Sequence, residues 1–151
     1  EKSLHEMDLH KAWDIEAKAK DILFKLNLSN LEQKVKTLSG GQVKRLALAH
    51  VLLTNADLII LDEPSNHLDL DMIEWLEEYL SQESLTVLMV THDRYFLDNV
   101  CDTIIELYNG NVHRYKGNYS QFLEKKEAMQ ENEAIRFDKL KQLYKKELDW
   151  V

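Results

Sequence analysis

The chain has 151 residues, of which 44% are hydrophobic and 30% are charged, and its formal net charge is −8. This length and mixture suit one globular domain and argue against wholesale disorder. No apolar run approaches the about 18 residues that a membrane span needs, and the acidic balance disfavours a broad nucleic-acid-binding face.

The first half of the sequence predicts two helices and a strand. Residues 11–28 place apolar side chains at helical spacing, which indicates an amphipathic helix. Ser39 and Gln42 have the spacing of a capping box, so a second helix is expected to begin there and to run to about Leu53. The short apolar run Leu58–Leu61 ends in acidic residues and indicates a buried strand.

The following segment continues this alternation. Residues 70–81 carry apolar side chains on one side and predict a helix, and residues 94–100 predict a short one. The run 85–90 is apolar and β-branched, which favours a strand covered on both faces. Residues 103–115, with Asn109-Gly110 at the turn, predict a hairpin. The order of elements is typical of an α/β fold with a largely parallel sheet.

The sequence changes character after Gly117, where we place a boundary. No glycine or proline follows, and apolar residues recur among mixed charges. This pattern predicts a long helix with a narrow apolar stripe, suited to a coiled-coil-like hairpin. The stripe comprises Phe122, Met129, Phe137, Leu140, Tyr144 and Leu148.

Three short segments carry residues suited to chemistry. Asp62 and Glu63 follow an apolar strand, and His92 follows the next one, so all three are expected at the carboxyl edge of the sheet. The turn Ser39–Gln42 contains two of the four glycines and opens a helix, where backbone N–H groups favour an anion. Taken singly, each also fits an ordinary turn or a structural histidine.

Together, the segments resemble the ATP-binding cassette (ABC) ATPases over residues 12–117. Leu38–Gln42 is similar to their signature sequence, and Leu58–Glu63 is similar to their Walker B strand. Ser65–Asp69 is similar to their D-loop, and His92 to their switch histidine. Four motifs agree in order, so the resemblance implies an ABC-type P-loop NTPase fold.

The details resemble the ABC-F group. Asp62–Asp69 fits its pattern, although Ser65 stands where threonine is usual, and Thr91–Asp98 and Gly117–Ser120 fit as well. The tail looks closest to the Uup-like branch. Family members are soluble proteins with two ABC domains and no membrane domain, and many act on the ribosome. The resemblance therefore implies a cytoplasmic parent protein whose partners include its second ABC domain and, by resemblance only, ribosomal RNA.

One departure from the family is large. The sequence contains no Gly-x-x-x-x-Gly-Lys-Ser/Thr loop, which cradles phosphates in such proteins. We therefore expect residues 1–117 to be the back part of a first ABC domain that lacks Walker A, with a remnant of the helical subdomain. Residues 118–151 are expected to begin the interdomain linker. Alone, the chain is expected to be inactive and to self-associate through uncovered apolar surfaces.

The resemblance also implies roles for residues. Asp62 would bind Mg²⁺ through water, Glu63 would polarise the attacking water, and His92 would contact the γ-phosphate of ATP. Asp69 would help to couple two sites. ATP held on the opposite ABC domain would be reached by the signature residues Ser39, Gly40, Gly41 and Gln42.

Other interpretations of the sequence remain open at this point. The parent could be the ATP-binding subunit of a membrane transporter, or the chain could be a non-catalytic interaction module. His67, near Asp62, Asp69 and Asp71, could also form part of a metal cluster, although the D-loop resemblance explains these residues better.

Overall fold

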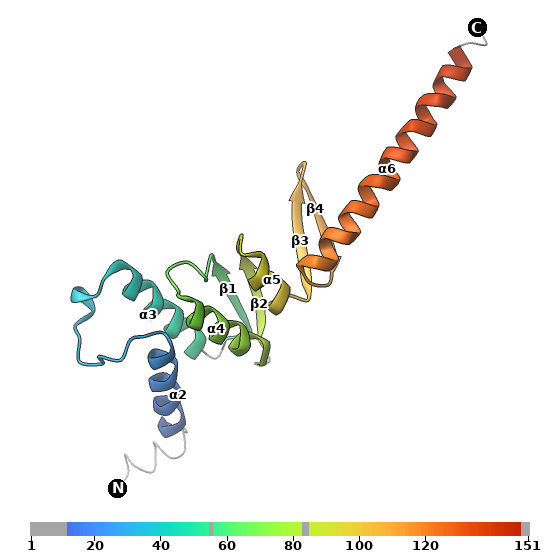
Figure 1. Cartoon of the computed structure of the whole chain (residues 1–151). Coiled ribbons are helices and arrows are strands. Elements are labelled where there is room, and N and C mark those ends of the chain that lie inside the picture. The colour runs from blue at the N-terminus through green and yellow to red at the C-terminus, as the bar shows by residue number, and fades with distance from the viewer. Residues whose placement is uncertain (1–11, 55, 83–84, 149–151) are drawn as a thin grey trace. The chain divides into compact units, whose positions relative to one another are not determined.

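The computed structural model describes residues 12–54, 56–82 and 85–148, and the chain divides into two compact units, Glu1–Phe96 and Leu97–Val151 (Figure 1). This division into packing units is a different property from the ABC domain boundary expected near Gly117, which stays a prediction.

The first unit begins with two helices that pack together. Helix α2 spans Ala12–Lys25, and helix α3 spans Gly40–Leu53. After α2, Asn27 adopts a φ of 55°, a left-handed conformation that asparagine tolerates better than most residues. The short 3-10 helix η1, Val35–Thr37, precedes α3. These elements confirm the two helices predicted from the sequence.

A β-α-β unit follows. Strand β1, Leu58–Asp62, pairs in parallel with β2, Thr86–Val90, and the last pair in the register is Asp62 with Val90. Helix α4, Leu70–Gln82, connects the strands and is shown in green in Figure 1. Its buried residues are Met72, Leu76 and Leu80, which recur at helical spacing.

The parallel sheet departs from the prediction in one respect. Ile59 and Leu61 are buried, but Ile60 is 67% exposed and Val90 is 61% exposed, so one face of the strand pair is open within the described residues. This exposure agrees with the uncovered apolar surface expected for the chain, and the cover expected on both faces of the strand at 85–90 is not supplied by the described residues. A continuous apolar run specifies what a strand can bury, but the covering elements must come from elsewhere.

Helix α5, Arg94–Val100, leads to a separate antiparallel hairpin in the second unit. Strand β3, Thr103–Tyr108, pairs with β4, Asn111–Lys116. The turn residues Asn109 and Gly110 have φ values of 49° and 74°, and two positive φ values characterise the turn that matches hairpin twist. The hairpin was therefore predicted correctly, including its turn.

Helix α6, Tyr119–Leu148, starts at the end of this hairpin. The Asn118 side chain accepts a hydrogen bond from the Gln121 N–H at 3.1 Å and so caps the helix. Phe122 is buried, and its ring meets that of Tyr115 edge-on at 4.9 Å between centroids. These contacts fix the first turns of α6 on the hairpin.

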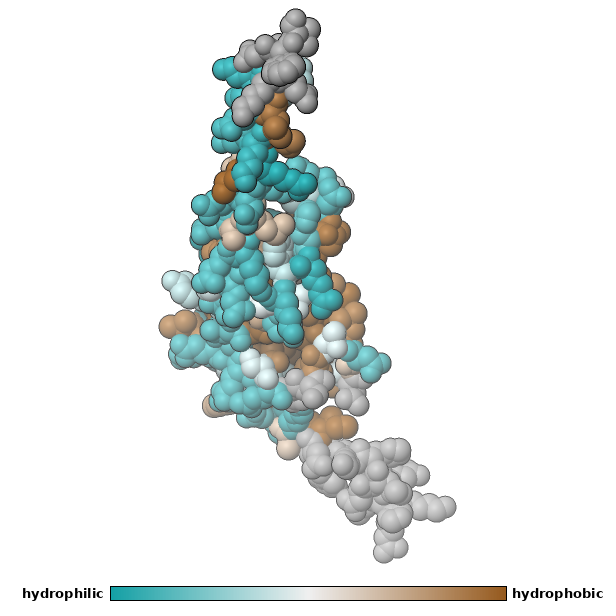
Figure 2. Space-filling view, turned by 90° about the vertical axis from the view of Figure 1, so that its right-hand side faces the viewer, coloured by the Kyte–Doolittle hydropathy of each residue, from teal (hydrophilic) through white to brown (hydrophobic). Residues whose placement is uncertain are grey.

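The remainder of α6 exposes its apolar stripe. Phe137 is 68% exposed and Leu140 is 59% exposed. In Figure 2, brown hydrophobic side chains interrupt the teal surface of this helix below the grey C-terminal residues. Met129 and Tyr144 are likewise exposed, and the side chain of Leu148 lies outside the described residues. The antiparallel partner of a coiled-coil hairpin stays a prediction.

Candidate functional site

The site is built where two parallel strands end. The N–H of Glu63 donates a hydrogen bond to the carbonyl of Val90 at 2.7 Å, one step beyond the last register pair. The chain therefore leaves β1 at Glu63 and leaves β2 at Thr91 on the same edge of the sheet. This is the arrangement that the sequence predicted for Asp62, Glu63 and His92.

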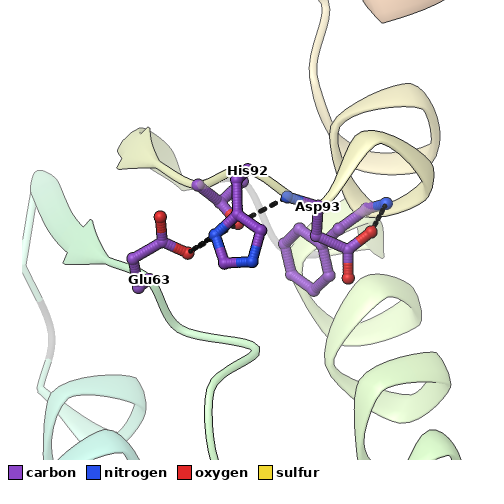
Figure 3. A network of polar contacts seen from close by, with 5 residues as sticks. Glu63, His92 and Asp93 are labelled. Carbon is purple, nitrogen blue, oxygen red and sulfur yellow. Dashed lines mark hydrogen bonds and ion pairs between the residues drawn. The ribbon is translucent and has the colours of Figure 1, made fainter.

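Glu63 and His92 form an ion pair at this edge (Figure 3). Nδ1 of His92 lies 2.9 Å from Oε2 of Glu63, and the Thr91 hydroxyl donates to the same oxygen at 3.2 Å. The histidine side chain is 79% exposed, whereas that of the glutamate is 29% exposed. The Glu63 carboxylate is thus held from one side by His92 and Thr91 and stays partly accessible to solvent.

The ion pair shifts the pKa values of both Glu63 and His92. The hydrogen bond from His92 lowers the pKa of Glu63 below its ordinary value, because it stabilises the carboxylate. The same hydrogen bond raises the pKa of His92 above its ordinary value, because the carboxylate favours the imidazolium. Glu63 is therefore an anion at neutral pH, and this anion can accept a hydrogen bond from a water molecule.

The backbone at Glu63 is also unusual. Its φ is 48°, in the left-handed region that non-glycine residues rarely adopt. The segment is held in this shape by a turn in which the Asn66 N–H donates to the Glu63 carbonyl at 3.1 Å. Strained backbone held by its surroundings is characteristic of functional positions.

Capping side chains hold the loops on either side of this edge. Asp69 accepts a hydrogen bond from the Met72 N–H at 3.0 Å and caps α4. Asp93 accepts one from the Phe96 N–H at 3.1 Å and caps α5, while its own N–H donates to Thr91. The ends of both site loops are thereby fixed to helices. The coupling role expected for Asp69 stays a prediction.

Asp62 fits a water-mediated metal ligand. It is exposed at the end of β1 and precedes Glu63 directly. The described residues contain no group of three or more His, Cys, Asp or Glu side chains that could hold a metal ion by themselves. Mg²⁺ commonly uses one or two carboxylates together with water and substrate phosphates, so a lone exposed aspartate suits it. His67 forms no metal cluster with its acidic neighbours.

The Ser39–Gln42 turn forms the predicted capping box at the start of α3, apart from the strand ends that carry Glu63 and His92. The Gln42 N–H donates to the Ser39 hydroxyl at 3.2 Å, and the Gln42 side chain accepts from the Ser39 N–H at 2.9 Å. A side chain at Gly40 would have nothing within 4 Å. Packing among the described residues therefore does not explain this glycine, whereas close approach of a ligand would.

A pocket of about 550 Å³ opens beside the acidic edge within the first unit. Asp62 and Glu63 line it from the strand end, and Lys44 and Arg45 line it from α3. The Nε atom of Arg45 is buried without a hydrogen-bond partner in the described structure. The remaining lining side chains are largely apolar and include Leu48, Val51, Ile60, Pro64 and Leu68.

The sequence reasoning missed two parts of this site. The sequence predicted no separate role for Thr91 within the segment Thr91–Asp98. In the structure its hydroxyl donates to Glu63 and accepts from the Asp93 N–H. Lys44 was assigned no role, yet it lies 2.7 Å from the ring of His67. Helical spacing places positions 41, 44 and 45 on one face of α3, but no local signal in the sequence points from that face to His67.

Comparison with protein families gives two matches. A model described as ABC transporter matches residues 1–66, and a second model with the same description matches residues 105–151. The segment between the two matches, residues 67–104, contains helices α4 and α5 and strand β2. Within the described residues, no helix combines the length and the apolar character that a membrane crossing requires.

Curated relatives match nearly the whole chain. The ABC transporter ATP-binding protein YfmR of Bacillus subtilis is 48% identical over 145 residues, which cover 96% of this chain and 23% of YfmR. The energy-dependent translational throttle protein EttA of Mycobacterium tuberculosis is 42% identical over 146 residues, which cover 97% of this chain and 26% of EttA. The chain thus spans about a quarter of the length of these relatives.

Solved structures agree with this likeness. An archaeal ribosome recycling factor, aABCE1, in complex with a ribosomal stalk protein, matches with a TM-score of 0.54 at 30% identity, covering 68% of this chain and 22% of that one. An ATP-binding cassette of an ABC transporter matches with a TM-score of 0.53 at 26% identity, covering 76% of this chain and 48% of that one.

Proposed function

The chain belongs to the ABC-F group of ATP-binding cassette proteins, and on this premise we propose that its parent protein is a cytoplasmic ATPase that works on the ribosome. The observation that carries the proposal is the Glu63–His92 ion pair at the carboxyl edge of two parallel strands. Proteins of this family use ATP and Mg²⁺, and we propose that the residues of this site bind and position both.

In this proposal, Glu63 orients the attacking water. Its lowered pKa keeps it ionised, so it accepts a hydrogen bond from the water more readily than it takes the proton fully. His92 neutralises part of its charge and presents the rest of an exposed ring toward the γ-phosphate of ATP. Positioning and charge neutralisation do most of the work in phosphoryl transfer, which suits this arrangement.

Asp62 would hold Mg²⁺ through water beside the same edge. When bound there, the ion would neutralise part of the charge on the phosphates of ATP. The exposed position of Asp62 leaves room for the water molecules that Mg²⁺ keeps.

The start of α3 would serve ATP held on a second ABC domain. Ser39 and Gln42 satisfy each other in the capping box, and the space beside Gly40 is open. An exposed helix start with this gap favours a phosphate group that approaches from outside the chain. Gly41 belongs to the same turn, and Asp69 would couple the two sites from its capping position on α4.

We further propose that residues 1–117 are part of the first ABC domain and that residues 118–151 begin the interdomain linker. The relatives are about four times as long as this chain, and the open face of β1 and β2 needs cover that the described residues do not supply. The absence of a glycine-rich phosphate loop in the sequence fits the same organisation, in which this chain alone is inactive.

Two of the similar proteins support ribosome action over transport, whereas YfmR is named as an ABC transporter ATP-binding protein. EttA is named a translational throttle protein, and aABCE1 is described as a ribosome recycling factor. The solved transporter cassette shares the fold at lower identity. RNA is the proposed partner on the ribosome by family likeness.

Co-sedimentation of the full-length protein with ribosomes tests the proposal. The substitution Glu63→Gln should trap the ATP-bound state and enrich the protein in the ribosomal pellet when ATP is present. The matched control is Glu74→Gln, the same change at an exposed position on α4. Absence of both variants from the ribosomal pellet, with and without ATP, would contradict a ribosomal role. Absence of ATP turnover in the wild type would favour a non-catalytic interaction module.

A further inference from the structure

The loop between β1 and α4 is pinned at its middle to helix α3. Nζ of Lys44 lies 2.7 Å from Nε2 of His67, and the Arg45 guanidinium donates to the carbonyl of His67 at 3.3 Å. A side chain at Gly41 would lie 3.9 Å from Cβ of His67, so the helix backbone passes close to the histidine. The three α3 residues have the spacing i, i+3 and i+4 and therefore share one helix face.

The two contacts reach different parts of His67. A lysine ammonium donates hydrogen bonds and accepts none, so Lys44 is the donor and Nε2 of His67 is the acceptor in the side-chain contact. Arg45 donates to the backbone carbonyl of His67 instead of the ring. The side chain and the backbone of His67 are therefore both held by α3.

Backbone hydrogen bonds hold the loop on both sides of His67. Toward the site, the Asn66 N–H donates to the Glu63 carbonyl at 3.1 Å. Toward α4, the Leu68 N–H donates to the Ser65 carbonyl at 3.2 Å. His67 itself has a φ of 71°, a left-handed conformation that its surroundings must maintain. A short run of hydrogen-bonded turns therefore joins His67 to Glu63.

We propose that His67 is a positioning residue that sets the place of Glu63 from the surface of α3. Lys44 holds the ring, Arg45 holds the carbonyl, and the turns between them and Glu63 transmit the position. The start of the same helix, Ser39–Gln42, is the part proposed to meet ATP on a second domain. Engagement of that turn would thus adjust the water-orienting carboxylate. This inference rests on the proposed ATPase function.

Three substitutions in the full-length protein test the contact. Lys44→Met removes the donor but keeps an apolar stem of similar length. His67→Asn tolerates positive φ but is too short to reach Lys44, so it separates the side-chain contact from the backbone conformation. His67→Gln again offers an acceptor at the ε position. Lys25→Met is the matched control, because Lys25 is exposed at the end of α2.

ATP turnover at saturation (kcat) and ATP affinity are measured for each variant. We expect Lys44→Met and His67→Asn each to lower kcat about tenfold or more, since small misplacements of a reacting group have large effects on rate. ATP affinity should change less than twofold, and His67→Gln should restore most of the rate. The double variant Lys44→Met/His67→Asn should be no slower than the slower single variant, since both remove one contact.

The outcomes separate this inference from the proposed function. A wild-type protein without ATP turnover contradicts the proposed function itself. An active wild type whose Lys44→Met and His67→Asn variants match Lys25→Met contradicts the positioning role. Additive losses in the double variant, or a parallel loss in ATP affinity, would show that the two residues act separately or only through folding.

Discussion

Nδ1 of His92 lies 2.9 Å from Oε2 of Glu63, although Glu63 follows the end of β1 and His92 follows the end of β2. The contact depends on the strand register, because Asp62 pairs with Val90 and the two loops leave the sheet together. A shift of one residue in this register would move one partner to the opposite face of its strand. The pair therefore reports whether the edge of the sheet is correctly assembled.

The first prediction concerns the titration of this pair. The pKa of His92 should lie above its ordinary 6.5, and Glu63→Gln should return it toward that value, because the substitution removes the carboxylate that stabilises the imidazolium. The measurement is a pH titration of the His92 ring by NMR. A titration midpoint that is the same in both proteins would contradict the ion pair.

The pH dependence of stability follows from the two shifts. The contribution from His92 is present below 6.5 and is lost as pH rises through the raised folded pKa. The contribution from Glu63 is present above 4.5 and is lost as pH falls through the lowered folded pKa. Glu63→Gln should therefore lower the melting temperature most between these values. The effect should be small, because the histidine is largely exposed.

The second prediction concerns the packing at the start of α6. Phe122 is 7% exposed and packs on Tyr115, so Phe122→Ala should destabilise the second unit by about 3–5 kcal/mol, the usual cost of removing a buried phenyl ring. Urea unfolding followed by the helical signal provides the measurement. Leu123→Ala is the control on the same helix, because Leu123 is 38% exposed and should have a much smaller effect. Equal effects would contradict the packing.

The third prediction concerns association of the isolated chain. Ile60 and Val90 lie on the open face of the strand pair, and Phe137 and Leu140 form part of the exposed α6 stripe. Apolar surfaces of this kind promote association, which should persist at high salt because charge does not drive it. Sedimentation equilibrium at tens of micromolar should show species larger than the monomer. A strict monomer in low and high salt would contradict the prediction.

Variants can locate that association. Phe137→Gln together with Leu140→Gln removes the α6 stripe, and Ile60→Thr removes one open strand position while keeping a β-branched residue. The variant that shifts the equilibrium toward the monomer identifies the surface that associates.

The fourth prediction concerns ATP binding by this chain alone. The sequence lacks the glycine-rich loop and its lysine, which cradle the β- and γ-phosphates in such proteins. Calorimetry with ATP and Mg²⁺ should therefore show very weak binding, and no turnover should be detected. Micromolar affinity would show that the described residues hold phosphates by another route.

The sequence predicted the local structure well because its signals are local. Ser39 and Gln42 are three residues apart and form the expected capping box, and Asn109-Gly110 forms the expected hairpin turn. The expected strand 58–61 is one residue longer in the structure. Apolar periodicity and turn chemistry suffice for elements of this kind.

The parts that were missed depend on distant contacts. Lys44 and His67 are 23 positions apart, and their contact needs the whole of α3 and β1 in place. Thr91 reaches Glu63 across 28 positions. An uncovered apolar surface was expected, but an apolar run does not reveal which strand positions, such as Ile60, stay exposed. Motif order predicted which residues lie at the carboxyl edge of the sheet, and their roles stay a prediction, whereas the geometry that holds them came only from the fold.

The rate of ATP hydrolysis by the full-length protein tests the central claim most directly. Wild type, Glu63→Gln and the control Glu74→Gln are compared in a single turnover with saturating protein. If Glu63 orients the water, Glu63→Gln should retain ATP binding and slow hydrolysis by about 10²–10⁴-fold, as expected for loss of a positioned base. Hydrolysis by Glu63→Gln at the rate of Glu74→Gln would contradict the assignment of the site.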